Sequence, residues 1–301
     1  MNDSQEARGP AFVLQGVERS FGSRRVLRGV SARAERGKVI GLLGRNGEGK
    51  TTLMRILLDM LEADAGAVEV LGLRPDGSGR IRQRVGYVPE RPAFHESMTG
   101  ADVLALRARF WRRWDMARAR ALSASLGLDL AERVSATSKG TVAKLAWVCA
   151  AAHDPELFLL DEPTSGLDAL VREEVLSKLI EELQDAGKTI FVANHRMEEL
   201  AGVLDEIWLL AGGAIVRVCD AERLRREACV VSGRIKDAAR EPEGVCAVRL
   251  KAEAPLAAWA AFDTESAERI LRSGSLEAGQ AASMPFEETL RRLLALGGGH
   301  D

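Results

Sequence analysis

The stretch GRNGEGKTT, residues 44–52, combines glycines with a lysine and two threonines, which are the residue types that hold phosphate groups. Its spacing, Gly44-x-x-x-x-Gly49-Lys50-Thr51, fits the phosphate-binding loop pattern. In such a loop, main-chain N–H groups point at the phosphates, the lysine reaches the β- and γ-phosphates, and the threonine hydroxyl binds Mg²⁺. The sequence therefore predicts a nucleotide bound at Lys50 and a magnesium ion bound at Thr51.

The surroundings of this loop agree with that prediction, except for one carboxylate inside it. The apolar run VIGLL precedes the loop and the helical pattern TTLMRILLDML follows it, which is the strand–loop–helix context that the pattern requires. Glu48 would oppose a bound polyanion unless Arg45 or an arginine elsewhere neutralises it. Because main-chain groups and Lys50 do most of the binding, we expect Glu48 to be tolerated and to face outward; a tuning role is the alternative.

Further polar side chains come at the ends of other apolar runs. Glu90 follows VGYVP, Asp161 and Glu162 follow LFLL, and His195 follows TIFVAN. Since ligands bind beyond the carboxyl ends of parallel strands, we expect these side chains to converge on one edge. Asp161 suits a Mg²⁺ ligand, and Glu162 suits the base that positions the attacking water. A lone histidine after a strand is more often a packed or surface residue, so His195 gains a role only from its neighbours.

Short apolar runs that alternate with helical patterns must position these groups. This alternation predicts a mostly parallel sheet covered by helices. The predicted strands are residues 38–43, 84–89, 157–161, 189–194 and 206–210, and the turn in residues 210–216 closes a β-hairpin.

Two segments stand apart from this pattern. Residues 97–134 are rich in arginine, alanine and leucine and predict an all-helical insertion, whose arginines form either a solvated face or a site for an anionic partner. After Asp220 the sequence becomes less regular, with the strand-like pieces CVVSGRI and VCAVRLK and a final amphipathic helix, FEETLRRLLAL. We expect a small appended domain there.

Composition limits the possible partners and compartment. The 301 residues include 42 basic and 44 acidic side chains, so the chain as a whole has no electrostatic signature of nucleic-acid or anionic-membrane binding. The four cysteines form no CxxC pair and are expected to be reduced thiols, as in the cytosol. No apolar run approaches the roughly 18 residues that span a bilayer, and the N-terminus resembles no secretion signal, so we expect a soluble, unexported chain.

These motifs, in this order, resemble the ATP-binding-cassette (ABC) ATPases, the nucleotide-binding subunits of ABC transporters. GRNGEGKTT corresponds to the Walker A loop, LFLLDE to the Walker B strand with its following acid, SGLD (165–168) to the D-loop, YVPE to the Q-loop and TSKGT (137–141) to the signature motif. The likeness covers about residues 11–218. Within the family, SKG, YVPE and WRRWD are most similar to the bacterial drug-export or GntR-operon group.

The resemblance implies a fold and a set of site residues. The fold is an α/β P-loop NTPase with a parallel core sheet, an antiparallel β subdomain and a helical insertion (about 91–140). This gives a nucleotide-binding domain over residues 1–220 and an accessory α+β domain over 221–301. The activity is Mg²⁺-dependent ATP hydrolysis coupled to transport. The implied catalytic residues are Lys50, Glu162 and His195, the metal ligands are Thr51, Glu90 and Asp161, and the nucleotide-binding residues are Phe21, Gly44, Asn46, Gly47, Gly49, Lys50, Thr51, Thr52, Glu90, Ser138, Gly140 and Asp168.

Two positions depart from the family pattern. The usual Q-loop glutamine is Glu90, which can bind Mg²⁺ or water through oxygen but donates no hydrogen bond. The usual LSGGQ signature is TSKGT, which retains Ser138 and Gly140 and adds the positive charge of Lys139. A helix that begins near Ser138 would favour an anion at its N-terminus, so the motif remains workable.

The family also implies partners. The signature of one subunit closes over the nucleotide held by another, so we expect a homodimer or heterodimer with two ATP molecules at its interface. The transmembrane permease is then a separate chain, and this subunit lies on the cytoplasmic face of the cell membrane. A soluble ABC ATPase acting on ribosomes or DNA is disfavoured, because the chain has one cassette and only about ninety residues separate its motifs. A regulatory, non-transport role remains open.

Overall fold

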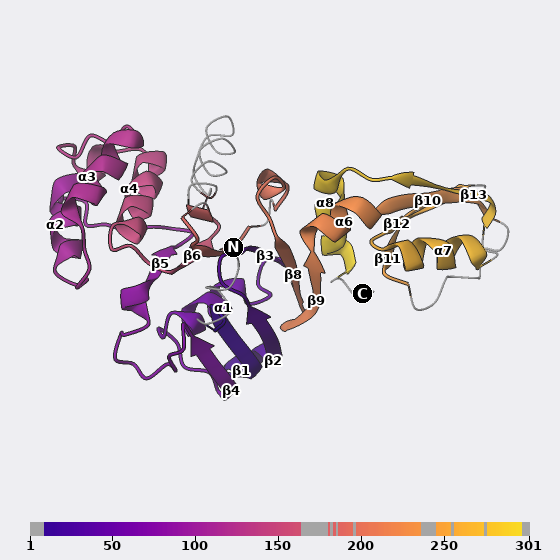
Figure 1. Cartoon of the computed structure of the whole chain (residues 1–301), viewed down its shortest axis with the longest axis horizontal. Coiled ribbons are helices and arrows are strands. Elements are labelled where there is room, and N and C mark those ends of the chain that lie inside the picture. The colour runs from indigo at the N-terminus through magenta and orange to yellow at the C-terminus, as the bar shows by residue number, and fades with distance from the viewer. Residues whose placement is uncertain are drawn as a thin grey trace.

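The computed structural model describes residues 9–163, 180, 183–184, 186–194, 197–235, 245–253, 256–273 and 276–296. Three groups of elements follow one another along the long axis of the molecule (Figure 1). A helical group lies at one end, the central sheet with helix α1 (Lys50–Leu57) lies in the middle, and a second sheet with its helices lies at the other end. None of the described helices is both long and apolar enough to cross a membrane.

The central sheet contains every strand that was predicted from the apolar runs. Its spatial order is β5 (Val85–Val88), β6 (Leu157–Asp161), β7 (Thr189–Ala193), β3 (Val39–Leu43), β8 (Glu206–Ala211) and β9 (Ala214–Asp220). The first five are parallel to their neighbours, and β9 returns antiparallel to β8, which confirms the predicted hairpin. Every residue of β3, β6 and β7 is buried, because helices and loops cover both faces of a parallel sheet.

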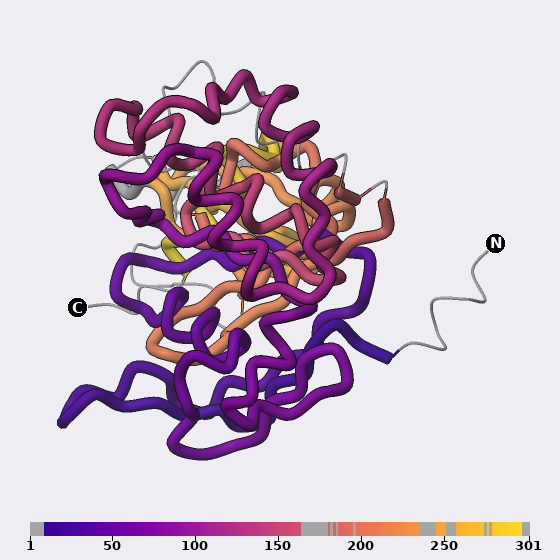
Figure 2. The backbone as a smooth tube through the Cα atoms, turned by 90° about the vertical axis from the view of Figure 1, so that its left-hand side faces the viewer, coloured from indigo at the N-terminus to yellow at the C-terminus, as the bar shows by residue number. Residues whose placement is uncertain are grey.

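A three-stranded antiparallel sheet packs against this core, as the family resemblance implied. Its order is β2 (Arg24–Ala34), β1 (Phe12–Phe21) and β4 (Ala65–Val70). Phe12 of β1 meets Phe191 and Trp208 of the central sheet edge-to-face, with ring centroids 5.1 and 5.6 Å apart. Such pairs add about 0.5–1.5 kcal/mol each to the stabilisation from buried area, so this cluster fixes one sheet against the other. Figure 2 shows the β1–β2 pair along the lower edge of the molecule.

The predicted helical insertion is confirmed and contains α2 (Gly100–Ala108) and α3 (Met116–Ser125); α4 (Lys139–Ala151), most of which lies beyond the predicted bounds, packs with them. Each helix begins at a side chain that accepts a hydrogen bond from the first turn, which is the usual helix-start signal. Thr99 and Asp102 form a reciprocal capping box, Asp115 accepts from Arg118 N at 3.0 Å, and Ser138 accepts from Thr141 N at 3.1 Å. The three helices share one apolar cluster that is separate from the main core.

The C-terminal region forms a second sheet with helices on both faces. The four antiparallel strands run in the order β11 (Ala247–Glu253), β12 (Leu256–Ala261), β10 (Cys229–Ile235) and β13 (Leu276–Ser283). Helix α6 (Ala221–Glu227) leads into this region, and α7 (Thr264–Arg272) packs on one face through Ile270. Helix α8 (Phe286–Leu296) instead inserts Leu290 and Leu293 into the main hydrophobic core. The predicted β10, β11 and α8 are confirmed, whereas β12, β13, α6 and α7 were not predicted.

Candidate nucleotide-binding site

The glycine-rich loop lies between β3 and α1, as its strand–loop–helix context predicted. Gly49 has a φ of +106°, and a Cβ atom there would lie 2.9 Å from side-chain atoms of Val26 and Leu27. At Gly44 a Cβ atom would lie 2.8 Å from the carbonyl oxygen of Leu210. Only glycine fits both positions, so the loop can pack tightly under β2 and β8 while its main-chain N–H groups remain at the helix N-terminus.

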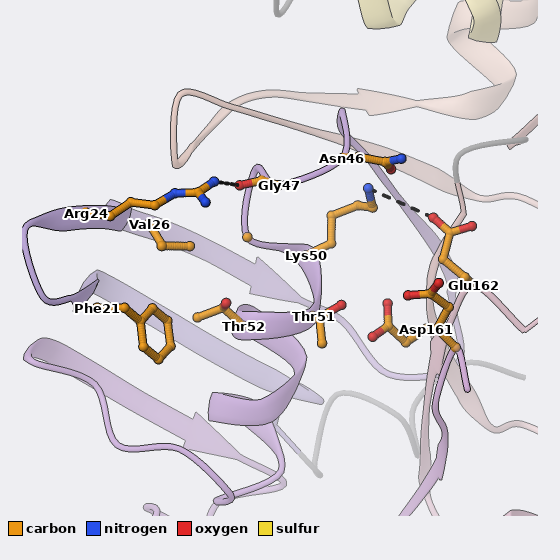
Figure 3. Close-up of a pocket in the computed structure, with 12 residues that line it drawn as sticks. Phe21, Arg24, Val26, Asn46, Gly47, Lys50, Thr51, Thr52, Asp161 and Glu162 are labelled. Atoms are coloured by element: carbon orange, nitrogen blue, oxygen red, sulfur yellow. Dashed lines mark hydrogen bonds and ion pairs between the residues drawn. The ribbon is translucent and has the colours of Figure 1, made fainter. Parts of the chain in front are cut away.

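A cavity of about 560 Å³ opens in front of this loop (Figure 3). Residues from the loop, the β1–β2 turn and the ends of two central strands come together there. The residues predicted from the sequence that line it are Phe21, Asn46, Gly47, Gly49, Lys50, Thr51, Thr52, Glu90, Asp161 and Glu162. Gly44 borders the same loop through its carbonyl group, which accepts a hydrogen bond from Lys50.

Lys50 places a buried positive charge at the centre of the loop. Its Nζ atom donates to the carbonyl oxygens of Gly44 at 2.8 Å and of Arg45 at 3.3 Å, and only 7% of the residue is exposed. Oε1 of Glu162 lies 4.0 Å from the same nitrogen, and Figure 3 shows the two side chains facing each other. The ammonium group is therefore oriented by the loop itself and lies next to a carboxylate.

Thr51 and Asp161 form the oxygen-rich side of the cavity. Both side chains line the cavity, and Figure 3 shows them next to each other. Burial raises the pKa of Asp161 above its ordinary value, the neighbouring Thr51 hydroxyl opposes this rise, and the nearby charges of Glu162 and Glu90 add to it. In the described ranges no three His, Cys, Asp or Glu side chains are grouped so as to hold a metal. These oxygens fit Mg²⁺, an ion that commonly keeps one or two protein ligands and completes its shell with water and phosphate oxygens.

Glu162 has an unusual main chain for a residue with a side chain. Its φ is +49°, in the left-handed region that residues other than glycine seldom adopt. A hydrogen bond from its N–H group to the carbonyl oxygen of Ala193 on the next strand, at 2.8 Å, stabilises this conformation. Such strain costs about 1–3 kcal/mol and is concentrated at functional sites. The turn leaves the side chain only 11% exposed and close to Lys50.

The other end of the cavity contains the predicted Phe21 ring and an arginine, Arg24, that was not predicted. Phe21 lines the cavity and is 49% exposed, and the Arg19 guanidinium lies over its ring at 5.0 Å from the centroid. Arg24 lies directly opposite Phe21 in the β1–β2 register and donates from Nη2 to the carbonyl oxygen of Gly47 at 3.1 Å. Because this pairing spans a hairpin turn, the only sequence signal was the nearness of the two residues along the chain.

Arg24 lies close in the fold to Glu48, the carboxylate inside the loop. Arg24 brings a cation to Gly47, the residue before Glu48, so it is an arginine elsewhere in the chain of the kind predicted to neutralise Glu48. Glu48 is partly buried, and among the residues described it is not one that lines the cavity, although Gly47 and Gly49 on either side are. Its outward orientation stays a prediction that this placement supports.

The structure does not bring all predicted residues to this cavity. Ser138 is exposed at the start of α4, with Gly140 in the first turn, and Figure 1 shows α4 grouped with α2 and α3, apart from α1. Neither residue lines the cavity of its own chain within the part that the structure describes. Asp168, with the rest of the predicted D-loop, and His195 lie outside the described residues.

Known proteins have sequences similar to that of this chain. The family model described as "ABC transporter" matches residues 27–165. The ABC transporter ATP-binding protein YtrB of Bacillus subtilis is 29% identical over 71% of this chain and 73% of its own length. The Nod factor export ATP-binding protein I of Rhizobium etli is 34% identical, over 67% of this chain and 66% of its own. The daunorubicin resistance ATP-binding protein DrrA3 of Streptomyces coeruleorubidus is also 34% identical, over 72% and 70%.

The chain matches only part of some relatives, and it also resembles a solved structure. The chain spans only 58% and 55% of two cyanobacterial relatives, from Nostoc and Synechocystis. A solved ATP-binding subunit of an ABC transporter superposes with a TM-score of 0.65 at 26% identity, over 72% of this chain and 92% of that one. The α/β architecture, the phosphate-binding loop and these relatives lead to one conclusion: the chain belongs to the ATP-binding proteins of ABC transporters.

Proposed function

We propose that this chain binds and hydrolyses ATP to drive a separate transmembrane permease, and that the transporter is an exporter. The observation that carries the proposal is the cavity in which Lys50 and Thr51, from the start of α1, meet Asp161 and Glu162, from the end of β6. The export direction is supported by the relatives named for Nod factor export and daunorubicin resistance.

The mechanism follows from the groups around the cavity. Lys50 exchanges its bonds to loop carbonyl oxygens for bonds to the β- and γ-phosphates, and the loop N–H groups from Gly44 to Thr52, including Asn46, hold the remaining phosphate oxygens. Thr51 and Asp161 would hold Mg²⁺, which neutralises developing charge when bound. Glu162 accepts a hydrogen bond from the attacking water and orients it.

The nucleoside end of ATP is assigned to the β1–β2 turn. The Phe21 ring stacks on adenine, and Arg24 adds positive charge beside the phosphate loop. Glu90, at the end of β5, lines the cavity and is proposed to sense the metal or water through its carboxylate. His195 is proposed as the second catalytic residue and Asp168 as an interface residue, both by resemblance to the family.

Ser138 and Gly140 are proposed to complete the site of a second ABC subunit, identical or different. The exposed N-terminus of α4, where Ser138 caps the helix and Lys139 adds charge, is suited to a phosphate on a facing chain. The permease docks on the same side as the helical insertion, where an apolar cavity of about 330 Å³ lies between residues 87–94 and α4. The subunit is therefore proposed to lie on the cytoplasmic face of the cell membrane and to have no nucleic-acid partner. Its two proposed domains are residues 1–220 and 221–301.

Glu162→Gln tests the catalytic core of this proposal. The substitution should lower steady-state phosphate release by at least about 100-fold, because it removes the group that positions the water. ATP binding should remain within about threefold, since Lys50 and Asp161 are intact, and an ATP-bound dimer should accumulate. Glu222→Gln, at an exposed position on α6, is the matched control and should hydrolyse ATP normally. Turnover by Glu162→Gln within about threefold of the parent, a barrier change of well under ~1 kcal/mol, would overturn the assignment.

Co-purification from membranes tests the partner. A transporter subunit should bring a polytopic membrane protein with it, and this association should survive high salt if apolar contacts dominate docking. Recovery of the full-length chain with ribosomes, or with no membrane protein, would favour the non-transport alternative.

A further inference from the structure

An arginine-lined cavity lies between the helical insertion and the segment before β5, away from the nucleotide site and next to the apolar cavity assigned to the permease. Its volume is about 840 Å³, and its walls are the segment from Leu73 to Arg84 and the end of α2 with the turn that follows. Five arginines line it, and no described lining residue is acidic. The five are Arg80, Arg82, Arg84, Arg107 and Arg112.

Three of these arginines have carboxylate partners outside the cavity lining. The pairs are Arg80 with Asp76, Arg82 with Asp59 at 3.7 Å, and Arg84 with Glu156 at 2.6 Å. Hydrogen bonds from Ser78 and then Arg80 lower the pKa of Asp76 to about 2, so that partner stays ionised at neutral pH. Glu156, whose pKa is held at about 2 chiefly by Arg84, is also shared with Arg36. These three charges are therefore largely compensated.

The remaining two arginines leave an excess of positive charge in the cavity. The Arg107 guanidinium lies 5.8 Å from the ring centroid of Phe94 and 5.6 Å from that of Trp111. Arg112 is exposed. Among the described residues, neither forms an ion pair with a carboxylate. Two uncompensated cations on one concave surface favour a multiply charged anion.

The walls of the cavity are connected to each other. The Gln83 side chain donates from Nε2 to the carbonyl oxygen of Phe110 at 2.7 Å and accepts from the Arg112 N–H at 3.0 Å. This amide ties the turn after α2 to the segment before β5, so the arginines from the two segments are held near each other before any ligand arrives. Preorganised donors lose less entropy on binding, which favours affinity.

We propose that this cavity binds a phosphate-bearing anion, with Arg107 and Arg112 as its principal contacts. A guanidinium can present two parallel N–H donors to phosphate oxygens, and a tetrahedral anion offers enough oxygens for several arginines at once. The rim adds an apolar group, since the Phe110 side chain is 63% exposed. The ligand class is therefore an organic phosphate, whose source is either a soluble ester or the headgroup of an anionic lipid.

The test separates these two sources and removes the competing phosphate loop. All binding measurements use the full chain carrying Lys50→Ala, which weakens phosphate binding at the nucleotide site. One arm titrates inorganic pyrophosphate by calorimetry, and the other measures co-flotation with vesicles of phosphatidylglycerol and phosphatidylcholine against vesicles of phosphatidylcholine alone. Whichever of the two measurements shows binding by the Lys50→Ala chain, the added double substitution Arg107→Gln/Arg112→Gln should weaken that binding at least tenfold. Arg28→Gln/Arg234→Gln is the matched control, because both of these arginines are exposed and lie in other parts of the fold.

Each outcome decides the proposal. Loss of pyrophosphate binding in the cavity variant, with the control unchanged, assigns a soluble phosphate, and loss of flotation assigns a lipid headgroup. The proposal is wrong if the parent chain binds neither probe, if the cavity variant and the control behave alike, or if polyglutamate displaces the probe as well as phosphate does, which would indicate an acidic peptide site. With Lys50 restored, the cavity variant must still bind ATP within twofold of the parent; if it does not, Arg112→Gln alone, at an exposed position, supplies the comparison.

Discussion

His153 gives the chain a defined sensitivity to acid. The side chain is 1% exposed behind the helical insertion, and its Nε2 atom lies 3.2 Å from the carbonyl oxygen of Val85. Burial, as the largest cause, lowers the pKa of His153 to about 4. In the unfolded chain His153 has an ordinary pKa near 6.5. Between that pH and about 4, the imidazole is therefore protonated in the unfolded chain and neutral in the folded chain. The free energy of unfolding should therefore fall between about pH 6.5 and pH 4 and be unaffected by this group above pH 7.

The size of this effect follows from the two pKa values. Linkage from 6.5 to about 4 gives a loss of roughly 1.4 kcal/mol at pH 5.5 and roughly 3 kcal/mol at pH 4, as upper values for one group. The same arithmetic gives less than about 0.1 kcal/mol at pH 7.5. Urea unfolding at pH 7.5 and pH 5.5 should thus show a difference of about 1.3 kcal/mol that depends on this one side chain.

His153→Gln isolates the contribution of His153 from those of other titrating groups. Glutamine retains a donor for the Val85 carbonyl group but does not titrate, so the variant should lose about 1.3 kcal/mol less than the parent between the two pH values. His95→Gln, at an exposed position, should retain the parent's pH dependence. Equal pH dependence in His153→Gln and the parent would refute the reasoning, whatever the absolute stability of the variant.

Three further predictions concern the nucleotide. Arg24→Ala should weaken ATP binding about three- to tenfold, less so in high salt, whereas Arg28→Ala on the same strand should not; calorimetry checks this, and equal affinities would exclude Arg24 from the site. Glu48→Ala should tighten ATP binding by no more than about tenfold, or ~1.4 kcal/mol, and a collapse of binding in the same titration would mean that Glu48 holds the loop together. Ser138→Arg should block ATP-dependent dimerisation in gel filtration while sparing monomer affinity. A dimer of one Ser138→Arg chain and one Lys50→Ala chain should trap one ATP, because only one of its two shared sites has both an intact Lys50 and an intact Ser138. If trapping of ATP by each chain depended only on that chain's own Ser138, the shared site would be contradicted.

The buried strands could be predicted because each is a short run that is apolar throughout, too short for a typical helix. Runs such as LFLLD are apolar throughout and short, which fits strands covered on both faces. Since the carboxyl ends of parallel strands share an edge, the meeting of Lys50, Thr51, Asp161 and Glu162 also followed from the sequence. Arg24 did not, because its place at the site depends on the turn at Gly22 and Ser23, which sets it opposite Phe21, and on the contact of its guanidinium with the Gly47 carbonyl oxygen.

The C-terminal strands show the opposite case. The sequences LAAWAA of β12 and LEAGQAAS of β13 are rich in alanine and lack β-branched residues, so their local preference does not indicate strands. They become strands because β10 pairs with both of them and because Trp259 and Ala261 are buried beneath α7. Tertiary pairing outweighs local preference here, and no window of the sequence contains that information.

The seating of α8 on the main core has a consequence for biosynthesis. Met197 and Leu200, in the short 3-10 helix after β7, are fully buried in the cluster that also contains Leu290 and Leu293. Arg291 adds an ion pair to Glu198 at 3.3 Å. A ribosome makes these partners about ninety residues apart. Until α8 emerges, the ATP-binding part of a nascent chain must keep an apolar patch exposed, so its folding is completed only after α8 has been made.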